Sequence, residues 1–155
     1  LIIVSLLTLN VNFCLASTDN KIFKKKGFII KNPQILYQDL NSKMITAYFE
    51  IKNTNSFDDK LLSVSGKISN NIQIHSTILK DGIMKMNKLN HGIEIKKNEI
   101  LKFEHGGYHI MIMDLEEKID EKVYVLNLNF EKSGKLSFTF EAMTFNKKLK
   151  MKHSH

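Results

Sequence analysis

Apolar and polar residues alternate along much of the chain, which is the pattern of β-strands with one buried face. In three stretches every second residue is apolar, and these are residues 45–51, 124–130 and 136–140. Turn-forming residues stand between such stretches: Asn53-Thr54-Asn55, Asp81-Gly82, Gly106-Gly107 and Ser133-Gly134. Short strands at this spacing predict an all-β sandwich or barrel, and we expect one domain over about residues 21–145.

Both ends depart from this pattern. Residues 1–16 carry no charge and end in Cys14-Leu15-Ala16, as in the apolar core and cleavage site of a secretory leader. The run is shorter than the roughly 20 apolar residues that span a bilayer. We therefore expect an exported protein whose leader is removed, and acylation of Cys14 in a lipoprotein is the alternative. Residues 146–155 are polar and basic, and we expect a disordered tail there.

The charge and the cysteine count exclude several kinds of site. The formal net charge is +7, and all 23 basic residues are lysines. Because arginine is the usual reader of guanine, base-specific nucleic-acid binding is not expected. The lysines are better suited to steering the protein toward acidic partners. Cys14 is the only cysteine, so a protein without its leader has neither disulfides nor thiolate ligands.

The Asp81-Gly82 pair predicts a hairpin with a two-residue loop. Lys80 would then pair with Ile83, and the register continues to the pair of His75 with Lys88. In this register His75 and Met86 are diagonal neighbours on one face, with Cβ atoms about 7 Å apart. Two long side chains can converge on one ion across that gap.

A second segment, residues 106–113, offers the same side-chain types. In a strand, His109, Met111 and Met113 share one face, and the isoleucines between them point into the core. Facing the hairpin, this strand would complete a site with two imidazoles and two thioethers. Thioether sulfur is a soft ligand that suits Cu(I), whereas zinc prefers thiolate, imidazole or carboxylate. Methionine on a strand also commonly fills a core, so the pattern alone leaves metal binding and plain packing both open.

These residues resemble the signature of the periplasmic copper chaperone family PCuAC, which is His, ten residues, Met, about twenty-one residues and His-x-Met. Here ten residues separate His75 from Met86, and twenty-two separate Met86 from His109. His109-Ile110-Met111 closes the motif. The resemblance covers roughly Ile35 to Phe140, and the segments that carry it are Ala47–Asn53, Asp59–Leu62, Asp81–Met86, Gly106–Met113 and Val125–Gly134.

The resemblance implies a cupredoxin-like, Greek-key β-sandwich that binds one Cu(I) through His75, Met86, His109 and Met111. It also implies delivery of copper to the copper-site subunit of cytochrome c oxidase or to another copper-assembly protein. Contact with a membrane would then come only through a membrane-bound acceptor. No enzymatic activity is expected, because the sequence offers no base, nucleophile or cofactor motif. The alternatives are a metal-free exported sandwich and a copper-dependent redox enzyme.

The chain departs from the family pattern at two points. His105 precedes the glycine pair where the family often has proline, and the loop after Met86 is one residue longer. The longer loop makes Met84 a substitute for Met86. Some family members carry His- and Met-containing tails that bind Cu(II), which the end of this chain resembles. Met113 is a further candidate, because it shares the face of His109 and Met111. The candidate auxiliary metal ligands are thus Met84, Met113, Met151, His153 and His155.

Overall fold

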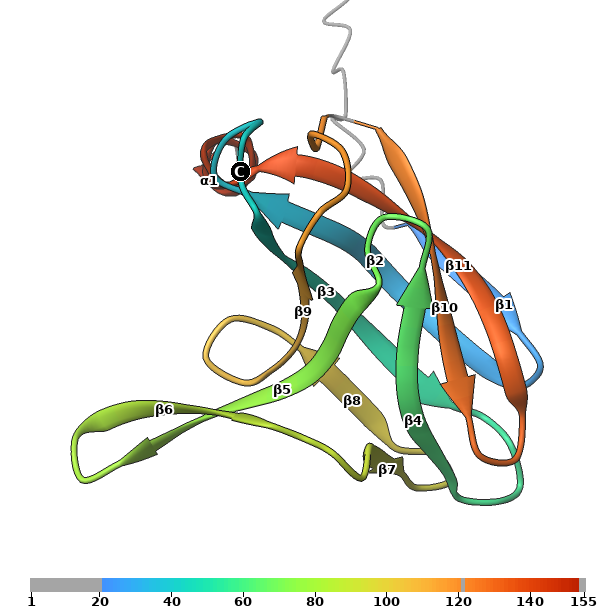
Figure 1. Ribbon diagram of the computed structural model, residues 1–155. Coiled ribbons are helices and arrows are strands. Elements are labelled where there is room, and N and C mark those ends of the chain that lie inside the picture. Colours follow the sequence, from blue (N-terminus) through green and yellow to red (C-terminus); the bar gives the residue numbers. More distant parts are fainter. Residues whose placement is uncertain (1–20, 121, 154–155) are drawn as a thin grey trace, which may run out of the picture.

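The computed structural model of the chain describes residues 21–120 and 122–153, with side chains as far as Leu149 in the last helix. Most of this part is β-structure (Figure 1). The strands are β1 (Ile22–Lys25), β2 (Phe28–Tyr37), β3 (Met44–Asn53), β4 (Asp59–Gly66), β5 (Asn71–Lys80), β6 (Ile83–Lys88), β7 (Ile93–Ile95), β8 (Ile100–Phe103), β9 (Tyr108–Met113), β10 (Val123–Phe130) and β11 (Gly134–Thr144). The expected all-β class is confirmed.

The strands form one continuous mixed sheet in the order β6-β5-β9-β8-β3-β2-β11-β10-β4-β7, with β1 paired to β2 and an additional pairing between β9 and β3. Most neighbours are antiparallel, but β11 runs parallel to β2 and β8 runs parallel to β9. The sheet bends so that β4 and β5, which are separated in the strand order, lie side by side (Figure 1). The curled sheet thus encloses a core as two facing layers do.

The core is built from the alternation seen in the sequence. Ile45, Ala47, Phe49 and Ile51 of β3 are all buried, and the residues between them are partly exposed. Aromatic rings join neighbouring parts of the core, because Phe49 stacks on Phe103 at a centroid distance of 4.3 Å. Burying each large apolar side chain stabilises the fold by about 1.5–3 kcal/mol, so this face holds the curled sheet closed.

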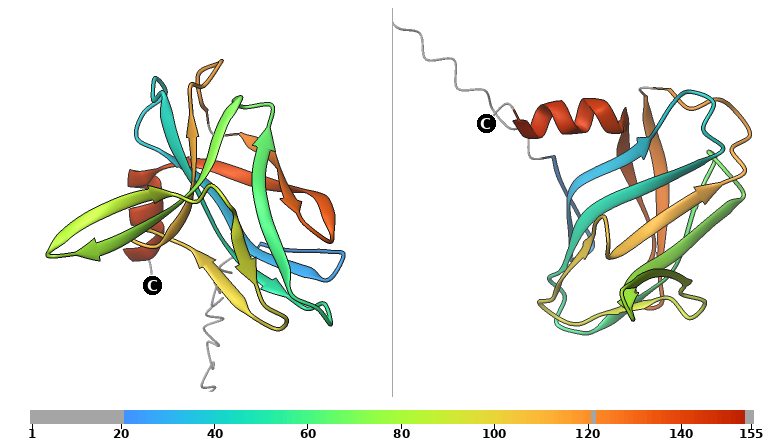
Figure 2. Two further views of the ribbon diagram at one scale, coloured as in Figure 1. Left: turned by 60° about the horizontal axis from the view of Figure 1, so that its bottom comes forward. Right: turned by 90° about the vertical axis from the view of Figure 1, so that its left-hand side faces the viewer.

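The β5–β6 hairpin has the predicted register. Lys80 pairs with Ile83, Thr77 with Met86 and His75 with Lys88. Asp81 and Gly82 both have positive φ, 54° and 75°, as a two-residue type I′ turn requires. The hairpin extends away from the rest of the sheet (Figures 1 and 2).

The expected disorder of residues 146–155 is wrong for most of that segment, because α1 (Phe145–His153) is a helix at the end of β11 (Figure 2). The Thr144 hydroxyl caps it by accepting a hydrogen bond from the Lys147 N–H at 3.2 Å. Lysine, which recurs in this segment, and leucine are good helix formers. Across the described ranges, no helix is both long and apolar enough to cross a bilayer.

Hydrogen bonds of Asp59 connect the start of β4 to the turn between β10 and β11. Its side chain is buried and accepts hydrogen bonds from the Ser133 hydroxyl at 2.6 Å and from the N–H groups of Lys60, Lys132 and Ser133 at 2.7–2.9 Å. Burial by itself would raise the pKa of Asp59. The four hydrogen bonds outweigh burial and lower the pKa below its ordinary value.

Candidate metal centre

The predicted metal-binding residues lie on three adjacent strands, β6, β5 and β9. His75 of β5 stands directly opposite His109 of β9, and Met111 stands opposite Gln73. On the other side of β5, Met86 of β6 stands opposite Thr77, diagonal to His75. Ile110 and Ile112 are completely buried in the core, so His109 and Met111 point to the other face of the sheet.

The two imidazoles face each other at a centroid distance of 5.6 Å and an interplanar angle of 47°. Metal–nitrogen bonds are about 2 Å long, as for zinc, so one ion between the rings could reach both. His109 is only 5% exposed and His75 is half-buried. The pair therefore lies largely out of solvent at the root of the hairpin.

Each ring has one nitrogen in a hydrogen bond and one without a partner. The Nε2 of His75 is 3.0 Å from the Oε1 of Gln73, and the Nδ1 of His109 is 3.1 Å from the Gly107 carbonyl oxygen. The Nδ1 of His75 and the Nε2 of His109 are buried and have no hydrogen-bond partner among the described residues. Buried polar atoms without partners are rare and costly, which fits two nitrogens that bind a ligand.

The electrostatic surroundings favour a neutral His75. Burial, followed by the charges of His109 and Lys88, lowers the pKa of His75 below its ordinary value. At neutral pH the ring therefore carries no proton on one of its nitrogens. A neutral imidazole with a free lone pair is the form that binds metals.

The glycine pair before β9 holds this arrangement together. The Gly107 carbonyl accepts the N–H of Thr77 at 3.0 Å and also lies next to the His109 ring. This carbonyl oxygen therefore connects β5 with the His109 ring. Gly106 has φ 80°, a conformation that favours glycine, while the side chain of His105 is exposed in the same loop.

The sulfur atoms differ in exposure. Met111 is 6% exposed, whereas Met86 is 52% and Met84 55% exposed. Met84 shares the face of Met86, and its methyl carbon lies 4.0 Å from where a Cβ on Gly106 would stand. It therefore reaches across β5 toward the loop before His109.

The other auxiliary residues lie farther away or outside the description. Met113 pairs with Met44 and Asn71 at the far end of β9. Met151 and His153 belong to α1, but their side chains, like all of His155 and Cys14, lie outside the described residues.

The two histidines give this centre two metal-binding groups, and any further ones must come from the thioethers of the methionines. No group of three or more His, Cys, Asp or Glu side chains in residues 21–120 and 122–153 could hold a metal ion. Carboxylate-rich sites for calcium or magnesium and thiolate sites for zinc are thus not formed in this part of the chain. A donor set of two imidazoles and two thioethers is soft and suits Cu(I).

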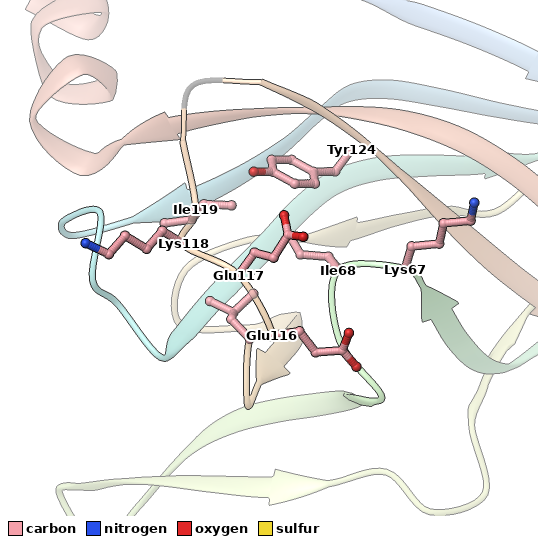
Figure 3. A pocket seen from close by; sticks show the side chains of 8 residues that line it. Lys67, Ile68, Glu116, Glu117, Lys118, Ile119 and Tyr124 are labelled. Atoms are coloured by element: carbon pink, nitrogen blue, oxygen red, sulfur yellow. The ribbon is translucent and has the colours of Figure 1, made fainter.

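A separate pocket of about 240 Å³ lies between the β4–β5 turn and the segment after β9 (Figure 3). Its polar lining carries both signs of charge, with Lys67 and Lys118 beside Glu116 and Glu117, and Tyr124 closes one side. None of the predicted metal ligands lines it, so it is distinct from the centre at the root of the hairpin.

Comparison with known proteins gives matches in sequence and in fold. The sequence model of the family described as "Putative lipoprotein LpqE-like" matches residues 29–142. A curated relative, "Putative lipoprotein Lxx21020" of Leifsonia xyli subsp. xyli, is 29% identical over 79 residues, which cover 51% of this chain and 48% of the relative. The chain thus spans about half the length of that relative.

Three solved structures share the fold. The apo PCuAC domain from PmoF1 has a TM-score of 0.66 at 15% identity, with 80% of this chain and 99% of that chain covered. The copper-bound PCuAC domain from PmoF2 has a TM-score of 0.65 at 15% identity, with 80% and 98% covered. CuI-DR1885 from Deinococcus radiodurans has a TM-score of 0.57 at 15% identity, with 72% and 74% covered. The expected cupredoxin-like fold of PCuAC domains is confirmed.

Proposed function

Since the chain belongs to the LpqE-like family, we propose that it is an exported copper carrier that holds one Cu(I) through His75, Met86, His109 and Met111. The observation that carries this proposal is the pair of facing imidazoles, each with a buried nitrogen that lacks a hydrogen-bond partner. The two methionines on the same face supply soft donors next to them.

The oxidation state follows from the donors. Neutral imidazole and thioether groups favour Cu(I) over harder ions, and a blue-copper electron-transfer site would need a cysteine thiolate. The copper-bound state of the PmoF2 domain supports copper as the ion for this fold, and the CuI form of DR1885 supports Cu(I). We propose binding and transfer of the ion rather than catalysis.

The acceptor that we propose is the copper-site subunit of cytochrome c oxidase or another copper-assembly protein. Several lysines surround the root and the end of the hairpin, namely Lys80, Lys85 and Lys88. Such a charge distribution speeds encounter with an acidic partner. The exposed Met86 is accessible to an incoming ligand of that partner.

We propose that the protein acts outside the cytoplasm, in the periplasm. The apolar leader supports export, and two alternatives remain for its fate, removal or acylation of Cys14. The lipoprotein descriptions of the family and of the Leifsonia relative add weight to a lipid anchor.

The direct test is titration of the purified protein with Cu(I) against a competing chelator, followed by X-ray absorption spectroscopy. We expect one tightly bound Cu(I) per chain, with two nitrogen and two sulfur neighbours, and weak binding of Zn(II). His91→Asn is the matched control, because His91 is exposed and outside the centre. A protein that binds no Cu(I), or a copper site without sulfur neighbours, would refute the proposal.

Deleting residues 147–155 is expected to leave tight Cu(I) binding unchanged, because all four proposed ligands lie on β5, β6 and β9. The same deletion should remove a weaker Cu(II) site if Met151, His153 and His155 form one. Parallel titrations of the full chain and the shortened chain with each ion separate the two sites. Loss of the tight Cu(I) site would show that the tail belongs to it.

A further inference from the structure

Four polar side chains form a hydrogen-bonded row that begins at His75. The Nε2 of His75 lies 3.0 Å from the Oε1 of Gln73, and the Nε2 of Gln73 donates to the Oδ1 of Asn71 at 2.9 Å. The Nδ2 of Asn71 then donates to the Oδ2 of Asp114 at 2.6 Å. Asn71, Gln73 and His75 are alternate residues of β5, so they share one face of the strand.

The carboxylate at the end of the row sets the direction of every hydrogen bond in it. An ionised carboxylate accepts but cannot donate, so Asn71 must turn its NH₂ group toward Asp114. The Oδ1 of Asn71 then faces Gln73 and needs a donor, which is the NH₂ group of Gln73. The Oε1 of Gln73 is left to face His75, and an amide oxygen accepts only.

We propose that Gln73, oriented by Asp114 through Asn71, is a positioning residue that keeps His75 in the tautomer with its proton on Nε2. The lone pair of His75 then lies on Nδ1, the buried atom that has no hydrogen-bond partner among the described residues. His109 is fixed the opposite way, because the Gly107 carbonyl accepts from its Nδ1 and leaves the lone pair on Nε2. The two rings thus offer different nitrogens to one ion.

This inference rests on the proposed copper site for its purpose, but the tautomer itself does not depend on copper. A ring whose lone pair already faces the site needs no rearrangement when the ion arrives. Hydrogen bonds of this kind to metal-ligating histidines are typically worth 10–100-fold in metal affinity. Gln73 should contribute on that scale without touching the ion.

Two variants test the row. In Asp114→Asn the new amide can donate to the Oδ1 of Asn71, so the whole row can reverse and present the NH₂ group of Gln73 to His75. Asparagine tolerates the positive φ of 51° at this position, so the backbone should be retained. Gln73→Leu removes the acceptor altogether. Glu116→Gln is the matched control, because Glu116 is a nearby exposed carboxylate that pairs with Asn70 outside the row.

The tautomers are read by long-range ¹H–¹⁵N NMR of the metal-free protein at pH 8. We expect His75 to carry its proton on Nε2 and His109 on Nδ1, in wild type and in Glu116→Gln. Asp114→Asn and Gln73→Leu should each increase the Nδ1–H form of His75 and leave His109 unchanged. A proton on Nδ1 of His75 in wild type, or no change in either variant, would overturn the proposal. A change in Gln73→Leu alone would overturn the role of Asp114.

Cu(I) titration of the same variants separates this inference from the proposed function. Gln73→Leu is expected to lower Cu(I) affinity by about 10–100-fold while the far-ultraviolet circular dichroism spectrum stays unchanged. A wild-type protein with the expected tautomers but no Cu(I) binding would refute the function and not the tautomer. Tight copper binding that is unaffected by Gln73→Leu would refute the positioning role and not the function.

Discussion

A variant in which Met86 and Met111 are both replaced by leucine is expected to fold normally and to lose tight Cu(I) binding. Leucine is close to methionine in volume, so even at the buried Met111 the cost in stability should stay below about 1.5 kcal/mol. Both thioether donors are lost, and two imidazoles alone are left to hold the ion. We expect Cu(I) affinity to fall more than roughly a hundredfold, since loss of outer partners alone costs 10–100-fold.

The measurement is competition with a Cu(I) chelator, with thermal unfolding as the check on the fold. The control is the double variant Met44→Leu and Met143→Leu, which pairs an exposed with a buried methionine away from the two histidines. That variant should bind Cu(I) as wild type does. Undiminished binding by the Met86 and Met111 variant would mean that the proposed ligand set is wrong. Adding Met84→Leu would then show whether the sulfur near Gly106 had taken over.

Asp59→Asn is expected to lower the free energy of unfolding by about 3 kcal/mol, because the substitution removes a buried charge that accepts four hydrogen bonds. The new NH₂ group would face donors instead of acceptors at the β10–β11 turn. Urea unfolding at pH 7 measures the loss. The neighbouring variant Asp58→Asn is the control, since Asp58 is exposed and its carboxylate accepts one hydrogen bond, from the Lys97 N–H.

The effect of Asp59→Asn should also depend on pH. The pKa of Asp59 is lowered in the folded protein, so its carboxylate stabilises the fold fully above the unfolded pKa of about 3.9. This contribution is lost as the pH falls through the folded pKa, which lies below that value. The difference in stability between wild type and Asp59→Asn should therefore be constant from pH 7 to 5 and shrink at pH 3. An undiminished difference at pH 3 would contradict the assignment.

The local parts of the fold were predictable from the sequence. The Asp81-Gly82 turn determines the hairpin register because a two-residue loop leaves one pairing, and every predicted pair is present. The alternation in residues 108–113 placed His109 and Met111 on one face in the same way. These patterns depend on neighbours within a few residues, which is why composition and spacing reveal them.

Other features depend on contacts between distant segments. The direct opposition of His75 and His109 needs the pairing of β5 with β9, across three intervening strands of sequence. The buried role of Asp59 arises from a turn more than seventy residues later. Helix α1 was missed because its residues show no apolar stripe, and its capping Thr144 belongs to the preceding strand.

The residues of β5 that we propose to position His75 could have been identified from the sequence. Polar residues alternate with isoleucine at the start of β5, as Asn71, Ile72, Gln73, Ile74 and His75. A row of three polar side chains on one strand face is a signal of a hydrogen-bonded network. Its last member, Asp114, comes from the residue after β9, and only the folded sheet brings it there.

The proposed ligands of the ion lie on strands that differ in how many neighbouring strands they pair with. In the described part of the chain, β9 is hydrogen-bonded to β5, β8 and β3, whereas β6 is an edge strand and pairs with β5 alone. Met86 can therefore shift without disturbing the core, while His109 and Met111 cannot. Ligand exchange with an acceptor would begin at the Met86 thioether, proceed through a shared intermediate, and end with departure of the ion from β9. The order in which the ligands dissociate from the ion would thus depend on how far each strand lies from the edge of the sheet.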